Sequence, residues 1–183
     1  MTARAAVPKN LFAIIAACAS VGAAGAAAPI PTRIGAGPKY LLPAASAAVA
    51  HARPVGRFRC TGDEGTRKLA HVEVFAEKLV LLLPASIGVA PHCSYEVRTT
   101  QPTGVVEYMP HVHPTLGDLF TVWGQSLSAH RIAGFRGSVA AWVGGKRWHG
   151  DVRAIPLRRH SEIVIEVGGY VPPHTFFLFS TGP

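Results

Sequence analysis

The sequence predicts an α+β fold in which one amphipathic helix packs against a β-sheet. Two observations carry this prediction. Residues 115–127 form the one convincing amphipathic helix pattern, and short segments on both sides of it alternate between apolar and polar residues, as strands do. A helix with one apolar face needs a sheet to cover, so the two patterns together favour a single two-layer domain.

The first 18 residues have the features of an export signal. Arg4 and Lys9 precede an apolar run at residues 11–17, which is too short to span a membrane. Residues 15–18, Ile-Ala-Ala-Cys, resemble the lipobox of bacterial lipoproteins, and this resemblance implies that Cys18 carries a lipid and becomes the mature N-terminus. The alternative is a secretory signal cut after residues 24–26, with Cys18 discarded. Either way, we expect a periplasmic, envelope-bound or secreted protein.

Residues 19–54 are rich in Ala, Gly and Pro and carry few large side chains. Such a segment cannot bury enough apolar area to offset the entropy lost on ordering, so the sequence predicts a flexible tether. A helix around residues 44–52 is possible, but it would be marginal in isolation. The remaining residues, 55–183, are enough for one modest domain.

Cys60 and Cys93 remain once Cys18 is lipidated or removed. Two thiols in an oxidising compartment most often pair, which predicts a disulfide that stabilises the fold by about 3–4 kcal/mol. A zinc site is the alternative. It is disfavoured because neither cysteine has a second Cys or His at zinc-like spacing.

Four strand-like segments precede the helix. Residues 71–75 alternate, and residues 79–83 follow after a short turn and end at Pro84, which predicts a first hairpin. Residues 94–99 and 105–109 flank the turn-forming residues 101–104 and predict a second hairpin.

The helix has a start signal and a continuous apolar stripe. Thr115 is placed to cap its first turn, and Asp118, three residues later, complements both the cap and the positive helix end. The large apolar side chains recur at helical spacing; they are Leu116, Leu119, Phe120, Trp123 and Leu127.

Three segments follow the helix. Residues 138–143 form a strand that returns through the turn 144–146, residues 155–157 form a short buried connector, and residues 161–167 form the clearest alternating strand in the chain. Hairpin, helix, strand, connector and final strand is the element order of the β-grasp, or ubiquitin-like, fold. We therefore expect a mixed β-grasp sheet with one main helix, preceded by an extra β-hairpin. A β-sandwich is the alternative, but it leaves the helix unexplained.

Gly168-Gly169 follows the last predicted strand. Ubiquitin-like carriers end in a free Gly-Gly carboxylate, whereas this chain continues to Pro183, so that carboxylate does not exist here. We expect a turn that carries residues 170–179 over the sheet edge.

A series of segments follows in order along the mature chain: 84–89, Cys93, 103–106, 115–120, 123–125, 150–157, His160, 162–168 and 171–174. Together they resemble an uncharacterised family of exported bacterial proteins. Relatives in that family carry a His-Thr-His-Asp segment and a further histidine on the returning strand, a cluster suited to a metal. The corresponding residues here are Arg98, Thr99, Thr100, Gln101 and Glu107, which bind Zn or Cu poorly. The resemblance thus implies location and fold, and no activity.

The best candidate metal ligands in the sequence are His111 and His113, because residues i and i+2 of a strand project to one face. His71 or His92 would complete a Cu or Zn site. Pro110 and Pro114 bracket the pair, however, and solvated loop histidines are the competing interpretation.

The chain is basic, with 18 Lys and Arg, 10 Asp and Glu and a net charge of +8. An anionic ligand is one explanation, and a solvated face is the alternative. Export argues against nucleic acid as a partner and favours an envelope protein or an anionic envelope polymer or lipid. The candidate ligand-binding residues are Lys146, Arg147, Arg153, Arg158 and Arg159.

The sequence contains no nucleophile elbow, Walker loop or dinucleotide fingerprint. We therefore predict a non-enzymatic binding module without a cofactor, tethered to the membrane if Cys18 is lipidated. The second hypothesis is a periplasmic Cu- or Zn-binding protein.

Overall fold

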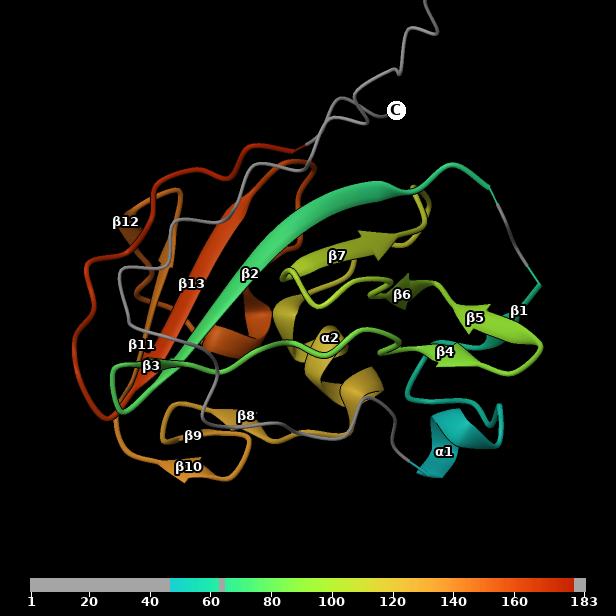
Figure 1. Ribbon diagram of the computed structural model, residues 1–183, viewed down its shortest axis with the longest axis horizontal. Helices are drawn as coiled ribbons and strands as arrows, with labels where there is room; N and C mark the ends of the chain where they lie inside the picture. The colour runs from blue at the N-terminus through green and yellow to red at the C-terminus, as the bar shows by residue number, and fades with distance from the viewer. Residues whose placement is uncertain (1–46, 63–64, 180–183) are drawn as a thin grey trace, which may run out of the picture.

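The computed structural model describes residues 47–62 and 65–179 (Figure 1). The predicted signal at residues 1–18, including Cys18, and the tether up to residue 46 lie outside the described residues. A seven-stranded sheet dominates the fold. Its strands are β2 (Lys68–Ala76), β3 (Leu79–Val80), β6 (Val97–Arg98), β7 (Val105–Tyr108), β11 (Val139–Val143), β12 (Lys146–Arg147) and β13 (Glu162–Val167).

Two three-stranded sheets and three helices complete the part of the chain that the structure describes. The first small sheet contains β1 (Cys60–Thr61), β4 (Val89–Ala90) and β5 (Cys93–Tyr95). The second contains β8 (Leu127–Ser128), β9 (Arg131–Ile132) and β10 (Phe135–Arg136). The helices are α1 (Ala47–Ala50), α2 (Leu116–Trp123) and the 3₁₀ helix η1 (Val152–Ala154).

The main sheet has the order β12-β11-β13-β2-β7-β6, and β3 pairs with β2 outside this path. β13 and β2 run parallel in the middle of the sheet, while the pairs β2/β7, β11/β13 and β11/β12 are antiparallel. Two antiparallel strands, a helix, and a last strand inserted beside the first is the β-grasp arrangement. The predicted α+β fold is confirmed.

The first predicted hairpin is present, since Phe75 lies opposite Val80, but β2 is also the first strand of the grasp. β3 to β6 are therefore an insertion between β2 and β7 rather than a unit that precedes the grasp. Residues 94–99, predicted as one strand, divide between two sheets: β5 pairs with β1 and β4, and β6 pairs with β7.

Helix α2 begins as the sequence predicts. The Thr115 side chain accepts from the Asp118 backbone N–H, and the Asp118 side chain accepts from the Thr115 N–H. Phe120 and Trp123 are buried. The helix ends at Trp123, because Gly124 adopts a left-handed conformation (φ 75°) at the C-cap. Leu127, predicted as part of the helix, instead begins β8 and is still buried.

The main core lies between α2 and one face of the sheet, where Val72, Val74, Ile163 and Ile165 project. Val49 of α1 is completely buried in the same core. The folded part therefore begins at least as early as Ala47, and the predicted boundary at residue 55 is too late. A four-residue helix is unstable alone, and burial of Val49 supplies the packing that it needs.

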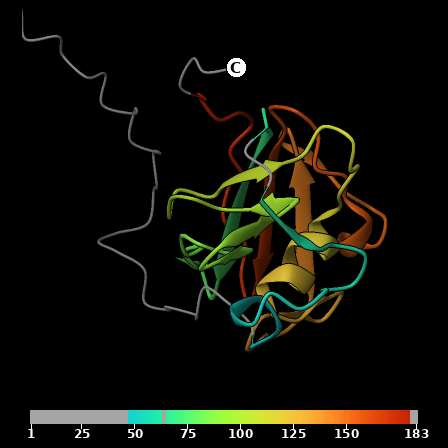
Figure 2. The same cartoon turned by 90° about the vertical axis from the view of Figure 1, so that its right-hand side faces the viewer.

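The opposite face of the sheet is covered by residues 170–179, here named the C-terminal segment (Figures 1 and 2). Gly168 (φ 77°) and Gly169 (φ 152°) form the expected turn. Val171 then packs on Phe75 of β2 and Val164 of β13. These are the central strands, so the segment crosses the face of the sheet and not its edge. The physical reason is that both central strands carry side chains on this face that need covering.

Cys60 and Cys93 form a disulfide between β1 and β5, which confirms the predicted pairing. The disulfide is compatible with an exported protein. Within residues 47–62 and 65–179, no helix is both long and apolar enough to cross a membrane.

Candidate metal centre

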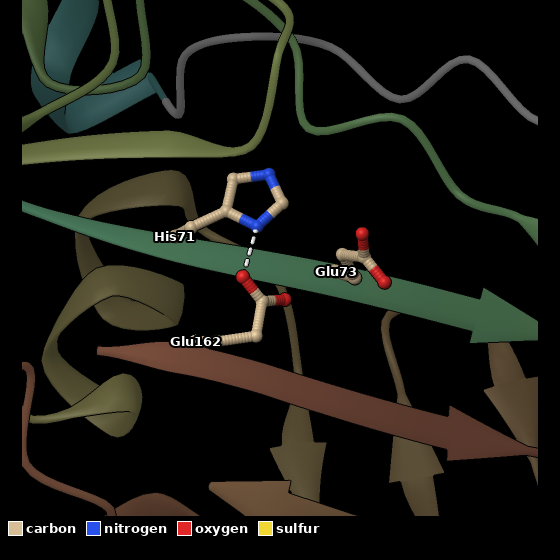
Figure 3. A group of neighbouring side chains, drawn as sticks. All are labelled: His71, Glu73 and Glu162. Atoms are coloured by element: carbon tan, nitrogen blue, oxygen red, sulfur yellow. Dashed lines mark hydrogen bonds and ion pairs between the residues drawn. The ribbon is translucent and has the colours of Figure 1, made fainter. Parts of the chain in front are cut away.

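The parallel pairing of β2 and β13 brings three side chains together on the face away from α2 (Figure 3). His71 lies opposite Glu162, and Glu73 lies two residues further along β2. Because side chains alternate along a strand, Val72 and Ile163 project into the main core while these three project to the other face.

Both ring nitrogens of His71 have partners. Nε2 lies 2.9 Å from the Thr103 carbonyl oxygen, and Nδ1 lies 2.7 Å from Oε2 of Glu162. A carbonyl oxygen only accepts, so Nε2 carries a hydrogen and donates it to Thr103. Nδ1 and Glu162 then share one further proton, which resides either on the imidazole or on the carboxyl. This leaves Nδ1 as the atom that would bind a metal.

The loop that holds Nε2 comes very close to His71. A Cβ added to Gly104 (φ 79°) would lie 2.8 Å from Nε2 of His71 and 2.6 Å from the Val72 carbonyl oxygen. Only glycine fits this position, and it lets the Thr103 carbonyl reach the ring. In metalloproteins, a backbone carbonyl in this role fixes the orientation of a ligating imidazole.

Glu162 is the most unusual member of the cluster. Its side chain is 1% exposed, and burial raises the pKa of its carboxyl, although the hydrogen bond and charge of His71 oppose the shift. Its second oxygen, Oε1, is buried and has no hydrogen-bond partner among the described residues. In Figure 3 this carboxylate lies next to the His71 ring on the side of β13, and Glu73 lies further along β2. A buried acceptor without a donor is unfavourable unless something binds it.

A residue of the C-terminal segment contacts Glu73 and holds it in place. Nδ1 of His174 lies 2.8 Å from Oε1 and 2.7 Å from Oε2 of Glu73, and the His174 side chain is 21% exposed. Phe177 stacks flat on the His71 ring, with centroids 3.8 Å apart and an interplanar angle of 12°. The segment thus orients one carboxylate and shields the imidazole from solvent.

A pocket of about 70 Å³ adjoins His71 and Glu73. Glu162 does not line this pocket, so the pocket lies beside the three side chains and is not the space between them. Its lining residues are 71–75, 80–83 and 102–104.

The three side chains offer one imidazole nitrogen and two carboxylate oxygens, all within 4.8 Å of one another. One nitrogen and two oxygens suit Zn²⁺, which binds His and Asp or Glu at about 2.0–2.2 Å. Coordination at those distances requires the three groups to rearrange around the ion and a metal to replace the shared proton of His71 and Glu162. The types of side chain present therefore suit a divalent metal.

The structure does not bring together the histidines that the sequence analysis proposed as ligands. His111 and His113 are exposed in the loop between β7 and α2, and His92 is exposed in the turn between β4 and β5. In the part of the chain that the structure describes, the group of three or more potential ligands contains His71 and none of those three histidines.

Sequence reasoning missed Glu73, Glu162 and His174. One signal was available, since Glu73 alternates with apolar residues on a predicted strand, as Glu162 does. In a β-grasp sheet these are the first and last strands, which lie side by side with both faces covered. Charged residues on such strands must find partners inside the protein.

The five predicted anion-binding residues are exposed but do not share one face. The Arg147 guanidinium lies 4.6 Å from the Trp142 ring, on the side of the C-terminal segment. Arg153 lies on the helix side, where it contacts Gly117 and reaches Thr121 Oγ1 and the Leu127 carbonyl oxygen. The predicted surface is therefore split between the two sides of the sheet.

Arg98, Thr100 and Glu107, which the sequence analysis compared with the histidines of a family that the chain resembles, lie close together on β6, just after it and on β7. Arg98 Nε is 2.8 Å from Glu107 Oε2, and Thr100 Oγ1 is 2.5 Å from Glu107 Oε1. A charge-paired carboxylate with an arginine beside it is a poor cation site. Comparisons of the chain with protein-family models, with curated proteins and with solved structures gave no match.

Proposed function

We propose that this protein is an exported, non-enzymatic β-grasp module that binds a divalent transition metal ion, with Zn²⁺ the preferred ion. The ligands are His71 through Nδ1, Glu162 and Glu73, and His174 orients Glu73. One observation carries the proposal: Glu162 has a fully buried oxygen without a hydrogen-bond partner among the described residues, beside two further metal-ligating side chains.

Charge supports this assignment. Glu73, Glu162 and Glu166 lie on one buried face with two histidines. Three carboxylates in a low-dielectric environment repel one another and lose hydration. A divalent cation offsets both effects, whereas a proton on Glu162 offsets only part of them.

The C-terminal segment supports a binding role rather than catalysis. Phe177 covers the His71 ring and His174 covers Glu73, so the ligand set is shielded from a large substrate. Export is supported by the disulfide and by the N-terminal sequence, and places the site where extracytoplasmic metal would reach it.

Zinc titration of the full chain with Cys18→Ser, after treatment with a chelator, tests the proposal. We expect one Zn²⁺ per chain by calorimetry and by elemental analysis. Glu162→Gln removes the charge at almost constant shape and should abolish stoichiometric binding.

Two control variants sharpen the test. Glu166→Gln removes another buried carboxylate from β13 and should leave one Zn²⁺ bound, as should His113→Ala in the β7–α2 loop. Absence of stoichiometric binding by the parent, or full binding by a folded Glu162→Gln variant, contradicts the proposal. Loss of binding in His113→Ala alone would favour the site that the sequence analysis suggested.

A further inference from the structure

The large apolar side chains that stay exposed in residues 47–62 and 65–179 all belong to the C-terminal segment. Tyr170 is 64% exposed, Phe176 69% and Leu178 67%. Single exposed apolar residues are common on soluble proteins, but their restriction to one ten-residue segment is not expected from chance scatter.

The same segment is anchored by the side chains that alternate with these. Val171 is buried against the sheet, Phe177 stacks on His71, and Phe179 stacks on His160 with ring centroids 4.6 Å apart. Phe176 and Leu178 therefore point outward because their neighbours are held inward. A ligand that contacts Phe176 and Leu178 therefore meets a preorganised surface, and little of the chain has to become ordered on binding.

Cations flank the exposed side chains. Arg147 and Tyr170 both contact Trp142, and the Lys78 stem lies against Gly169. The turn before β12 contacts Thr175 through Gly145. At the other end of the C-terminal segment, where Phe179 stacks on His160, the exposed residues Arg158 and Arg159 directly precede His160. One acidic residue, Glu77, also lies near the exposed side chains, beside Gly168.

We propose that the C-terminal segment, with its flanking Lys and Arg residues, is a docking surface for an anionic phospholipid membrane. Phe176 and Leu178 insert into the headgroup region, Tyr170 lies at the interface, and the cations contact lipid phosphates. A protein partner fits less well, because a stable protein interface buries about 800 Å² on each side, whereas here three side chains stand out from a narrow extended segment. The proposal is independent of the metal site.

Flotation and fluorescence binding with vesicles test this docking surface. The full chain with Cys18→Ser, which excludes any contribution from an acyl chain, is mixed with vesicles of phosphatidylglycerol and phosphatidylcholine in equal parts, or of phosphatidylcholine alone. We expect binding to the anionic vesicles only, with affinity that falls as salt is added.

Variants separate the apolar from the electrostatic contribution. Phe176→Ser and Leu178→Ser should each weaken partitioning by about tenfold, since each removes a large apolar side chain from the insertion surface. Arg147→Glu should also weaken it, since Arg147 lies over Trp142 on the side of the C-terminal segment. Arg53→Glu makes the same charge change near α1, at the opposite end of the molecule from β12 (Figure 1), and should have little effect.

Three results would overturn the proposal. The first is no binding to anionic vesicles, and the second is equal binding by the parent and the Phe176→Ser, Leu178→Ser double variant. The third is a parent protein that binds no vesicles but forms a concentration-dependent dimer in sedimentation, with the dimer absent in the double variant. That result would assign the surface to a second copy of this chain.

Discussion

His71 of β2 and Glu162 of β13 lie directly opposite each other in the parallel strand pair, with Nδ1 and Oε2 2.7 Å apart and both side chains 1% exposed. The two residues are 91 positions apart in the sequence. Their contact joins the first and last strands of the grasp on the face that the C-terminal segment covers.

Replacing His71 with Ala should destabilise the metal-free protein. The substitution leaves Glu162 buried with neither oxygen bonded to a side chain and opens space beneath Phe177, so we expect a loss of about 2–4 kcal/mol. Urea unfolding followed by circular dichroism measures this. The double variant His71→Leu, Glu162→Leu should be less destabilised than His71→Ala, because no buried carboxyl is left without a partner. If the losses of stability caused by His71→Leu and by Glu162→Leu alone add up to the loss in the double variant, the two residues do not interact.

The stability of the metal-free protein should decrease as the pH rises above 4.5. Burial raises the pKa of the Glu166 carboxyl above the value of 4.5, while the Val171 N–H and the charge of Arg147 oppose the shift. Burial likewise raises the pKa of Glu162 above 4.5. The folded state thus binds these protons more tightly than the unfolded state does. Their contribution to the free energy of unfolding is complete below pH 4.5 and is lost as the pH passes the raised values.

Glu166→Gln should make this pH dependence shallower, since it removes one of the two carboxyls. Unfolding in urea with a chelator, repeated across this pH range, provides the measurement. His71, Glu73 and His174 face the same region and are common to both proteins. Identical pH dependence for parent and variant would exclude Glu166 as a source of the slope.

His174→Ala should weaken Zn²⁺ binding by about tenfold without changing the stoichiometry. His174 contacts Glu73 through Nδ1, and loss of a group that orients a ligating carboxylate typically costs 10–100-fold in metal affinity. Competition with a chromophoric chelator gives the affinity, and His113→Ala serves as the control. A complete loss of binding would instead identify His174 as a ligand, and an unchanged affinity would exclude both roles.

Asp118→Ala should destabilise the fold by about 1–2 kcal/mol. The substitution removes one half of the capping box at α2 and the 2.9 Å ion pair with Arg57, which is partly exposed and contributes little. Thermal and urea unfolding measure the change. Thr115→Ser keeps a hydroxyl at the cap and should stay within about 0.5 kcal/mol of the parent. Equal losses for the two variants would argue against the reciprocal cap.

Local patterns were sufficient to predict the secondary structure around the helix. Thr115 and Asp118 start α2 through bonds that span three residues, and the apolar stripe through Phe120 and Trp123 is buried as its periodicity predicts. The end of the helix was predicted too late, because the left-handed conformation of Gly124 outweighs the apolar spacing that continues to Leu127. The buried place of Val49 could not be predicted, since it depends on contacts far from α1 in the sequence.

In the candidate site, too, local sequence patterns predict one part of the arrangement and tertiary contacts decide the rest. Alternation in the sequence by itself determined that His71 and Glu73 share one side of a strand and that Glu162 lies on another, because side-chain direction along a strand is a local property. Only the tertiary structure decided that these strands are parallel neighbours in a register that places His71 against Glu162, and that His174 and Phe177 return over them. Register and segment packing depend on the free energy of the whole sheet, which no short stretch of sequence contains.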